Sequence, residues 1–366
     1  MHTYKIIILY IAVWNNKGGA GKTTLTFHLS TEYAIQNPDK NIIVIDMCPQ
    51  GNISAALLSN LDKGMKGIAG DAILQKITIG EKVQGFDKTV CGYLLTKIDT
   101  TLRSDIPCES FLVQPSIYNK FITDNIYLLC GDPYLEVIAK RLEQERQLMA
   151  TRMGDIPWKR VTLFIKDFID KLSENMEKEC IVFIDTNPSF SVYTEMAIGG
   201  ATRVIVPINA DDFSRAAVTS MLYLLYGIVR GDRRDERYDV FKTMEFSYVA
   251  PKYDIAIPKI HLIINNKVTP YNTRSAKAFS AKAKEVSDSL ECILRDYPNI
   301  FVSATKSGYE CELNDFHTKA VQCLQLGCPL SKLPNWVVMH GNEKVHNVGK
   351  TRDDYLPNLQ SIIDRL

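Results

Sequence analysis

Short runs of consecutive apolar residues alternate along the chain with stretches in which apolar residues recur every three or four positions. Such runs, rich in Ile and Val without polar alternation, are typical of parallel strands covered on both faces. The intervening stretches have the period of amphipathic helices. The alternation predicts an α/β fold with a mainly parallel, doubly wound sheet flanked by helices. The predicted strands are Ile6–Trp14, Ile42–Asp46, Ile126–Leu129, Ile181–Asp185, Arg203–Pro207, Ile260–Asn265 and Ile300–Ser303.

Amphipathic stretches between and after these strands are predicted as helices. The first ends at Asn37-Pro38, which is a helix stop signal. Another is expected to open at Asp132 as an N-cap, with Pro133 at the first helical position, and to run toward Met149. The remaining predicted helices are Trp158–Asn175, Ser214–Val229, Ser275–Arg295 and Tyr355–Arg365, and the first covers Lys22–Gln36.

Composition excludes several classes of protein without identifying one. The net charge of +1 favours no particular partner, so any nucleic-acid surface has to be local. Nine cysteines, an odd number, contain no Cys-x-x-Cys pair and form no zinc spacing with the six histidines, which indicates free thiols in a reducing cytoplasm. The longest apolar run, Ile6–Trp14, is far shorter than the roughly 20 residues that span a bilayer. We therefore expect a cytoplasmic protein without a membrane segment.

The strongest chemical signal is the segment Asn15–Thr24, which lies between the first predicted strand and the first predicted helix. Its glycines let consecutive backbone N–H groups face one anion, and the start of the helix adds its dipole. This is the context of a phosphate-binding loop. Lys22 is expected to reach the β- and γ-phosphates, and the Thr23 hydroxyl to bind Mg²⁺. The predicted nucleotide-binding residues of the loop are Gly18, Gly19, Ala20, Gly21, Lys22, Thr23 and Thr24.

The loop departs from the strict Gly-x4-Gly-Lys-Thr pattern, because the first glycine of that pattern falls on Asn16. An additional lysine, Lys17, opens the run Lys-Gly-Gly-Ala-Gly-Lys-Thr instead. The segment resembles the ParA/MinD family of deviant Walker A ATPases, which includes plasmid-partition and cell-division positioning proteins. The resemblance spans roughly residues 6–330 and implies a P-loop NTPase fold like that of the nitrogenase iron protein. It further implies ATP and Mg²⁺ as cofactors and a homodimer in which Lys17 reaches the nucleotide of the partner subunit. A glycine loop in a dehydrogenase-like fold is the alternative.

The second predicted strand leads into Asp46-Met-Cys48-Pro-Gln-Gly-Asn, which resembles the first switch of that family, Asp-x-Asp-Pro-Gln-x-Asn. By this resemblance Asp46 and Cys48 join Lys17 and Lys22 as the catalytic positions, with Cys48 in place of the aspartate that orients the attacking water. A neutral thiol accepts hydrogen bonds poorly, so we expect slow hydrolysis with nucleotide binding retained. Cys48 is alternatively an inert buried thiol or a redox-sensitive switch, which needs a lowered pKa and exposure.

Two later segments complete the resemblance. Asp185-Thr-Asn-Pro resembles the second switch, Asp-x-x-Pro, and places Asp185 with Thr23 at the metal. Asn265 and Asn266 lie where the family contacts adenine, although a turn-forming pair of asparagines is the alternative.

Residues 267–284 carry five basic side chains and no acidic one. On the predicted helix Lys277 and Lys284 lie opposite an apolar stripe, with Arg274 just before the helix, and such a row can follow DNA phosphates without reading sequence. An ordinary charged outer face is the alternative. The candidate DNA contacts are Arg274, Lys277 and Lys284.

The leading hypothesis is a ParA-like ATPase that forms a nucleotide-sandwich dimer and serves as a partition or positioning switch, read by an adaptor protein or by non-specific DNA. The second is a nucleotide-gated regulatory or defence module with little or no hydrolysis, which Cys48 favours. A biosynthetic P-loop enzyme, such as a carboxylating synthetase, is a third, against which Lys17 argues. We expect residues 1–330 to form the ATPase domain, with a helical insertion over 57–150, and 331–366 to pack on it as an appendage.

Overall fold

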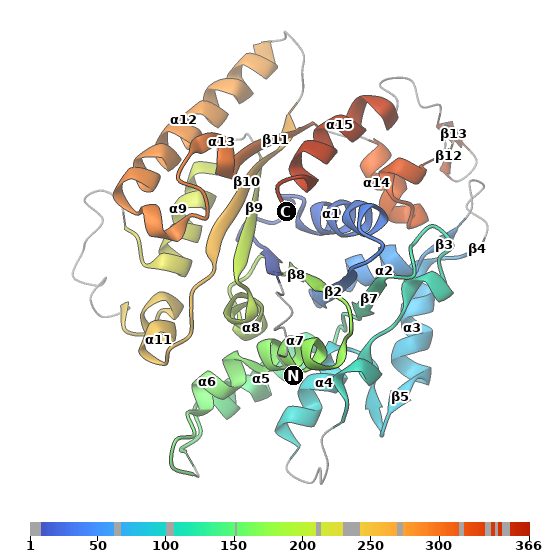
Figure 1. Ribbon diagram of the computed structural model, residues 1–366, viewed down its shortest axis with the longest axis vertical. Helices are drawn as coiled ribbons and strands as arrows, with labels where there is room; N and C mark the ends of the chain where they lie inside the picture. The colour runs from blue at the N-terminus through green and yellow to red at the C-terminus, as the bar shows by residue number, and fades with distance from the viewer. Residues whose placement is uncertain are drawn as a thin grey trace.

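A seven-stranded sheet, parallel at every pairing, runs through the centre of the molecule (Figure 1). The order of its strands is β11-β10-β9-β1-β8-β2-β7. The strand order therefore reverses at β1, and in doubly wound sheets such a point opens a crevice at the carboxyl ends of the strands. The strands are β1 (Leu9–Val13), β2 (Asn41–Met47), β7 (Ile126–Leu129), β8 (Cys180–Thr186), β9 (Arg203–Asn209), β10 (Lys259–Val268) and β11 (Glu310–Asn314).

The computed structural model describes residues 9–61, 67–99, 106–150, 152–209, 214–229, 242–268, 274–314, 318–333, 338–340, 343–345 and 352–366. Its helices are α1 (Lys22–Gln36), α2 (Asn52–Leu58), α3 (Gly70–Gly80), α4 (Val90–Ile98), α5 (Leu135–Arg146), α6 (Pro157–Thr162), α7 (Phe164–Asn175), α8 (Val192–Gly200), α9 (Ser214–Tyr226), α11 (Phe246–Lys252), α12 (Arg274–Asp296), α13 (Lys306–Tyr309), α14 (Thr318–Leu326) and α15 (Arg352–Ile363). Short 3-10 turns are η1 (Cys108–Phe111), η2 (Pro115–Ile117), η3 (Pro298–Ile300) and η4 (Leu330–Lys332). Three strand pairs lie outside the sheet: β3 (Asn60–Leu61) with β4 (Gly67–Ile68), β5 (Lys82–Val83) with β6 (Phe86–Asp87), and β12 (Val338–His340) with β13 (Glu343–Val345).

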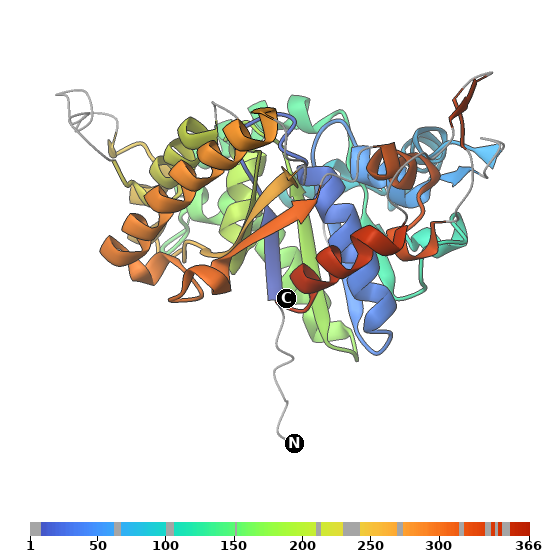
Figure 2. The same cartoon turned by 90° about the horizontal axis from the view of Figure 1, so that it is seen from above.

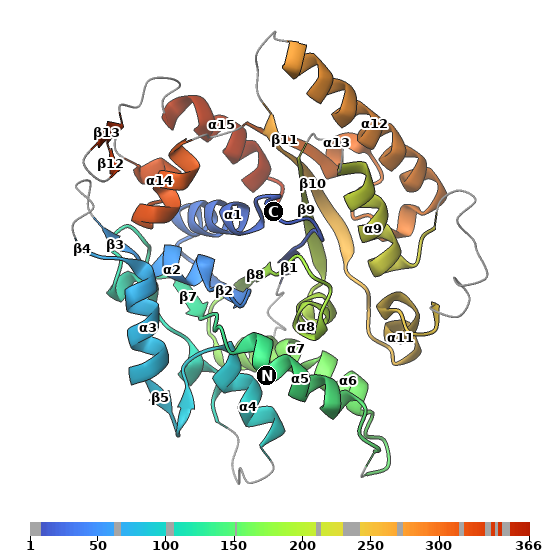
Figure 3. The ribbon, with the colours of Figure 1, turned by 180° about the vertical axis from the view of Figure 1, so that it is seen from behind.

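Helices cover both faces of the sheet, as its continuous apolar strands require. One face packs against α1, α2, α3, α14 and α15, whereas α4 to α8 cover the other face at the β7 end and α9, α11 and α12 cover it at the β10 end. Figure 2 shows α15 beside α1, and Figure 3 shows α2 lying between α1 and α3. α15 contributes Leu359 and Ile362 to the same core cluster as Leu25 of α1, so α15 packs on the α1 face of the sheet.

The prediction of a strand over Ile300–Ser303 is wrong. That segment begins at the last residue of the turn η3 and makes a single bridge, between Phe301 and Ile260. The edge strand is β11 instead, in which buried Cys311 and Leu313 alternate with more exposed polar residues. An edge strand is covered less completely than a central one, so its apolar residues alternate with polar ones, and a search for continuous apolar runs passes over it.

Two helix predictions also need correction. α5 begins at Leu135, not at Asp132, because the Asp132 carboxylate accepts the backbone N–H of Tyr134 at 2.8 Å and so forms a turn ahead of the helix. The stretch predicted as one helix over Trp158–Asn175 is divided into α6 and α7 at Leu163, whose backbone leaves the helical region. Within the described residues no helix is both long and apolar enough to cross a membrane.

Candidate functional site

The loop between β1 and α1 lies at the carboxyl end of the central strand, beside the point where the strand order reverses. Gly19 and Gly21 have φ angles of +71° and +88°, a region that side-chain-bearing residues rarely adopt. A Cβ on Gly21 would also lie 2.2 Å from the Asn266 amide nitrogen. Gly21 is the N-cap of α1 and has no side-chain cap, so the first N–H groups of the helix face the loop. The glycine backbone and the uncapped helix start together form a cradle of backbone N–H groups, an arrangement that suits an anion.

Lys22 is buried at the base of this loop. Its ammonium donates to the backbone oxygens of Asn15 and Lys17 at 3.1 and 3.0 Å. Burial lowers the pKa of Lys22, and the negative charge of Asp185 opposes that shift. The ammonium therefore lies inside the cradle on weakly held carbonyl partners, which an anion with stronger acceptor oxygens can replace.

The predicted metal residues come together. The Thr23 hydroxyl donates to Asp185 Oδ2 at 2.7 Å, and the Thr26 hydroxyl donates to Asp185 Oδ1 at 3.3 Å. Asp185 lies near the end of β8, next to β1, and is fully buried. A hydroxyl and a carboxylate are the oxygen ligands that Mg²⁺ takes beside phosphates, so these residues fit that ion.

Asp46 lies directly beside Asp185, because the two are register partners on β2 and β8. Its Oδ1 accepts the backbone N–H of Cys48 at 3.0 Å, and its Oδ2 accepts the N–H and the hydroxyl of Ser54 at 3.1 and 2.6 Å. Burial raises the pKa of both carboxyl groups, and the charge of Asp46 raises the pKa of Asp185 further. Two adjoining buried carboxylates repel each other when both are charged, and a bound cation would relieve that repulsion.

Cys48 has 6% of its surface exposed. Burial and the negative charge of Asp46 raise the pKa of its thiol to about 12. The thiol is therefore protonated at neutral pH and shielded from oxidants. A redox-sensitive switch needs a thiol with a lowered pKa and an exposed sulfur. Burial of Cys48 therefore favours the alternative that it is an inert thiol.

The loop is braced from the β9 side by residues that sequence reasoning did not single out. Asn15 donates through its side chain to Pro207 O at 2.7 Å, and Asn209 donates to Gly19 O at 3.2 Å. Asn15 also accepts the backbone N–H of Lys17 at 3.0 Å, which fixes the start of the loop where Lys17 lies half-buried. The extra lysine is therefore held on a rigid base at the mouth of the cradle.

The two predicted adenine contacts separate onto opposite faces of β10, as neighbours on a strand do. Asn266 donates to Ala20 O at 3.0 Å and lies on the loop side. Asn265 donates to Glu310 Oε1 at 3.1 Å, and Glu310 accepts from Ser287 of α12. The structure brings Asn266 to the loop and does not bring Asn265 there.

Of the three candidate DNA contacts, only the Lys284 side chain belongs to the described part of α12, where it is exposed. The side chains of Arg274 and Lys277 lie outside the described residues.

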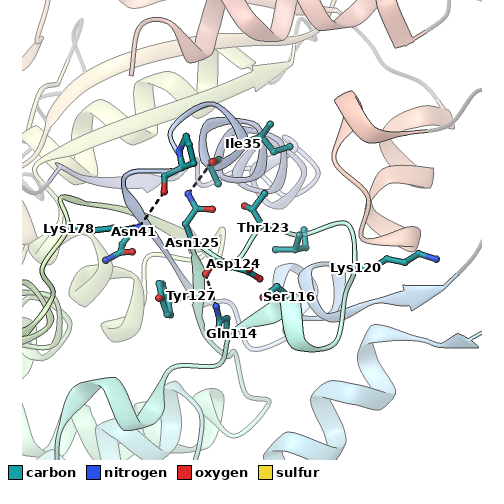
Figure 4. A pocket seen from close by; sticks show the side chains of 13 residues that line it. Ile35, Asn41, Gln114, Ser116, Lys120, Thr123, Asp124, Asn125, Tyr127 and Lys178 are labelled. Atoms are coloured by element: carbon teal, nitrogen blue, oxygen red, sulfur yellow. Dashed lines mark hydrogen bonds between the residues drawn. The ribbon is translucent and has the colours of Figure 1, made fainter.

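A cavity of about 760 Å³ opens at the opposite end of the sheet, near the amino ends of β2 and β7 (Figure 4). Asn41, Gln114 and Tyr127 line it, and Asn125 donates there to three backbone oxygens at 3.0–3.1 Å. Asn125 thereby closes the connection between α1 and β2. None of the predicted site residues lines this cavity.

Sequence comparisons with known proteins match part of the chain, and the matching family model includes the glycine loop. The family model described as "AAA domain" matches residues 8–231. A putative replication protein A of Rhizobium rhizogenes is 24% identical over 223 residues, which is 60% of this chain and 45% of that protein. The chain thus spans about half the length of that curated relative.

Solved structures match the fold over nearly the whole chain. An ATP complex of a McdA variant from Cyanothece has a TM-score of 0.58 at 14% identity and covers 98% of this chain and 96% of that one. A putative plasmid partition protein from Borrelia burgdorferi, bound to AMPPNP, has a TM-score of 0.51 at 15% identity, with 98% of each chain covered. The dehydrogenase-like alternative is therefore wrong. The chain belongs to the AAA domain family, and its fold is that of the ParA/MinD-like P-loop ATPases.

Proposed function

We propose that this chain binds ATP and Mg²⁺ at the loop of residues 15–24, dimerises across the nucleotide and acts as a partition or positioning switch with slow hydrolysis. The observation that carries the proposal is the hydrogen bond between Thr23 and Asp185, directly under the glycine loop and the uncapped start of α1. A hydroxyl and a carboxylate, the kinds of group that bind Mg²⁺, thus lie next to backbone N–H groups of the kind that bind phosphate, and this supports the proposal. The relatives named as a McdA and a plasmid partition protein, each solved with a nucleotide, support the same reading.

The chain's own residues account for phosphate recognition. Lys22 exchanges the carbonyls of Asn15 and Lys17 for phosphate oxygens, which are stronger acceptors. Gly19 and Gly21 keep the backbone N–H groups turned into the cradle, and Thr23 with Asp185 holds the ion. Mg²⁺ supplies neutralisation of the charge that develops on the phosphates. Phosphoryl transfer depends mainly on such positioning and on charge stabilisation, and these are what the residues above would provide.

Lys17 is proposed as the residue that reaches the nucleotide of a second subunit. Gly18 and Gly19, which follow it, are exposed, whereas Ala20 and Lys22 are buried, so the outer side of the loop is open to a partner. The test is the molecular mass in solution with and without ATP–Mg²⁺. We expect a dimer only with ATP–Mg²⁺, and a monomer for Lys17→Ala under the same conditions. Lys178→Ala, which removes an equal charge at the opposite end of the sheet, should dimerise as the wild type does. A wild type that stays monomeric with ATP–Mg²⁺ would refute the sandwich dimer.

The second candidate function is a nucleotide-gated regulatory or defence module that scarcely hydrolyses ATP. The protonated, buried thiol of Cys48 favours it, because this group cannot orient a water as a carboxylate does. Turnover of the wild type and of Cys48→Asp tests whether Cys48 limits hydrolysis. A gain on the order of a hundredfold in kcat for Cys48→Asp supports a slow switch limited by this position. Equal rates would mean that Cys48 does not limit hydrolysis.

Non-specific DNA binding by α12 is the remaining part of the proposal. Exposed Lys284 and the acid-free stretch 267–284 support it. Binding of a DNA duplex should weaken steeply with salt, and the triple change of Arg274, Lys277 and Lys284 to Ala should reduce the slope. No binding at low salt would exclude this surface.

A further inference from the structure

The Asp46 carboxylate is hydrogen-bonded to Ser54, whose hydroxyl is also bonded to the backbone after β7. Ser54 lies in the first turn of α2 and is fully buried. Its hydroxyl donates to Asp46 Oδ2 at 2.6 Å and accepts the backbone N–H of Gly131 at 2.9 Å. A serine hydroxyl has one hydrogen to donate, and here that hydrogen goes to the carboxylate. Ser54 therefore joins the end of β2 to the turn that follows β7.

The same contacts fix how α2 begins. Its N-cap, Gly51, has a φ of +64° and no capping side chain. The Asp46 carboxylate instead accepts the N–H of Ser54, at the third position of the helix, at 3.1 Å. Asp46, near the end of β2, thus caps α2. The first switch segment, residues 46–52, is therefore a loop whose two ends are joined by these hydrogen bonds.

The turn after β7 leaves no space for Asp46 to move. A Cβ on Gly131 would lie 2.7 Å from the Asp46 carboxylate and 3.0 Å from Cys48 O. Only glycine fits here without a shift of its neighbours, because the Asp46 carboxylate is bonded to Ser54 and Cys48 O accepts the N–H of Gly51. The Gly131 backbone and the Ser54 hydroxyl therefore hold the carboxylate from two sides.

Beyond Gly131 the buried hydrogen bonds continue into α4. Asp132 Oδ2 accepts the Thr89 hydroxyl at 2.8 Å, and Thr89 is the N-cap of α4, where it accepts the N–H of Gly92. The N–H of Val90 donates to Cys130 O at 2.9 Å. Asp46, Ser54, Thr89 and Asp132 are all fully buried. Buried polar groups that satisfy one another in this way hold a single arrangement, since breaking any bond leaves an unpaired group without water.

We propose that Ser54 is a positioning residue whose hydroxyl holds the Asp46 carboxylate and the Gly131 amide in one unit, so that the first switch moves together with the turn after β7 and the start of α4. The inference rests on the proposed function, because Asp46 acts there beside the nucleotide. The chain of hydrogen bonds would thereby connect α4 to that site. Ser54 itself touches neither phosphate nor metal, and its effect on turnover passes through Asp46.

The experiment compares Ser54→Ala with Ser59→Ala in the full chain. Ser59 follows the same helix and also loses a buried hydrogen bond of 2.6 Å, but its hydroxyl donates to Gln325 O, away from Asp46. For Ser54→Ala we expect kcat to fall by on the order of tenfold to a hundredfold, with the KM for ATP changed by less than about threefold. Amide exchange at Gly131 should become at least about tenfold faster, with faster exchange also at Val90 and Gly92. Ser59→Ala should keep the wild-type kcat and the wild-type exchange at Gly131.

Equal kcat in the two variants, or unchanged exchange at Gly131 in Ser54→Ala, overturns the inference. A wild type that neither binds nor hydrolyses ATP refutes the proposed function instead, and is recognised before any variant is compared. Exchange at Gly131 is measured without nucleotide, so it still decides whether Ser54 holds this unit. Faster exchange at Gly131 in Ser54→Ala but not in Ser59→Ala supports the role of Ser54, and unchanged exchange at Gly131 in Ser54→Ala rejects it.

Discussion

Replacing Gly131 by alanine tests whether the carboxylate site is as tightly enclosed as its geometry indicates. The new Cβ would lie 2.7 Å from Cγ and Oδ2 of Asp46 and 3.0 Å from the Cys48 carbonyl oxygen. Asp46 cannot yield freely, because its carboxylate accepts three hydrogen bonds from Cys48 and Ser54. The clash must therefore be relieved by a shift of the backbone or by the loss of these bonds.

Either route has a known cost. Overpacking a well-filled interior costs about 1–3 kcal/mol, and losing a hydrogen bond to a charged group costs about 1.5–3 kcal/mol. The two routes are alternatives, so we expect Gly131→Ala to lower the free energy of unfolding by about 2–3 kcal/mol. This is a substantial part of the roughly 5–15 kcal/mol that stabilises a typical domain.

Urea unfolding followed by circular dichroism measures this loss. Gly80→Ala is the matched control, since Gly80 ends α3 and a Cβ there meets nothing within 4 Å. Alanine is a better helix former than glycine, so the control should be neutral or more stable by up to about 1 kcal/mol. If Gly131→Ala is also within about 0.5 kcal/mol of the wild type, a size that is ordinary for surface changes, the enclosed-carboxylate account is wrong.

Three further results are expected. Asn266→Ala should weaken ATP binding by about three- to tenfold, because the loop loses the hydrogen bond from Asn266 to Ala20 O. Asn265→Ala should leave the affinity unchanged, because Asn265 is bonded to Glu310 instead. Titration with a fluorescent ATP analogue compares the two variants, and equal effects would contradict the separation of the two side chains. Mg²⁺ should strengthen ATP binding about tenfold less in Thr23→Ala than in the wild type. Thr31→Ala, which loses a hydrogen bond to Phe27 O in the same helix, should behave as the wild type does. Isothermal titration with and without Mg²⁺ measures both effects. Burial raises the pKa of Glu32, which accepts the N–H of Ser331 at 2.7 Å, so the stability that its protonation contributes is present below the unfolded-state pKa and is lost as pH rises through the folded-state pKa. Glu32→Gln should therefore gain melting temperature relative to the wild type between pH 4 and pH 7, and a difference that is constant with pH would contradict this.

The sequence predicts the parts of the site that lie next to strand ends. Asp46 and Asp185 end continuous apolar runs, and Lys22 follows the glycine loop that leaves the first such run. Parallel strands deliver their carboxyl ends to one edge, so the proximity of these residues follows from order along the chain. Six of the seven predicted strands coincide with observed ones for the same reason. The seventh failed because β11 alternates apolar and polar residues at the sheet edge.

Contacts that depend on register between distant segments could not be predicted. Ser54 meets Gly131, 77 positions away, and Asn209 meets Gly19, 190 positions away. Nothing in the local pattern around these residues indicates a partner, since serine, asparagine and glycine are common in loops. The split of Asn265 from Asn266 was foreseeable from strand alternation alone, which sends neighbours to opposite faces. The one clue to Ser54 is its place in the first turn of the helix after the switch segment, and that clue does not name Asp46 as its acceptor.

The affinity of the wild type and of Lys22→Ala for ATP in the presence of Mg²⁺ tests the central claim most directly. Lys22 is the buried ammonium inside the glycine cradle. Lys40→Ala removes an equal charge outside the cradle, because Lys40 lies between α1 and β2, beside Glu179. We expect the wild type and Lys40→Ala to bind ATP equally, and Lys22→Ala to bind at least about a hundredfold more weakly, because charge-assisted bonds to phosphate are lost. Equal affinity for all three proteins, or no binding by the wild type, would contradict the account.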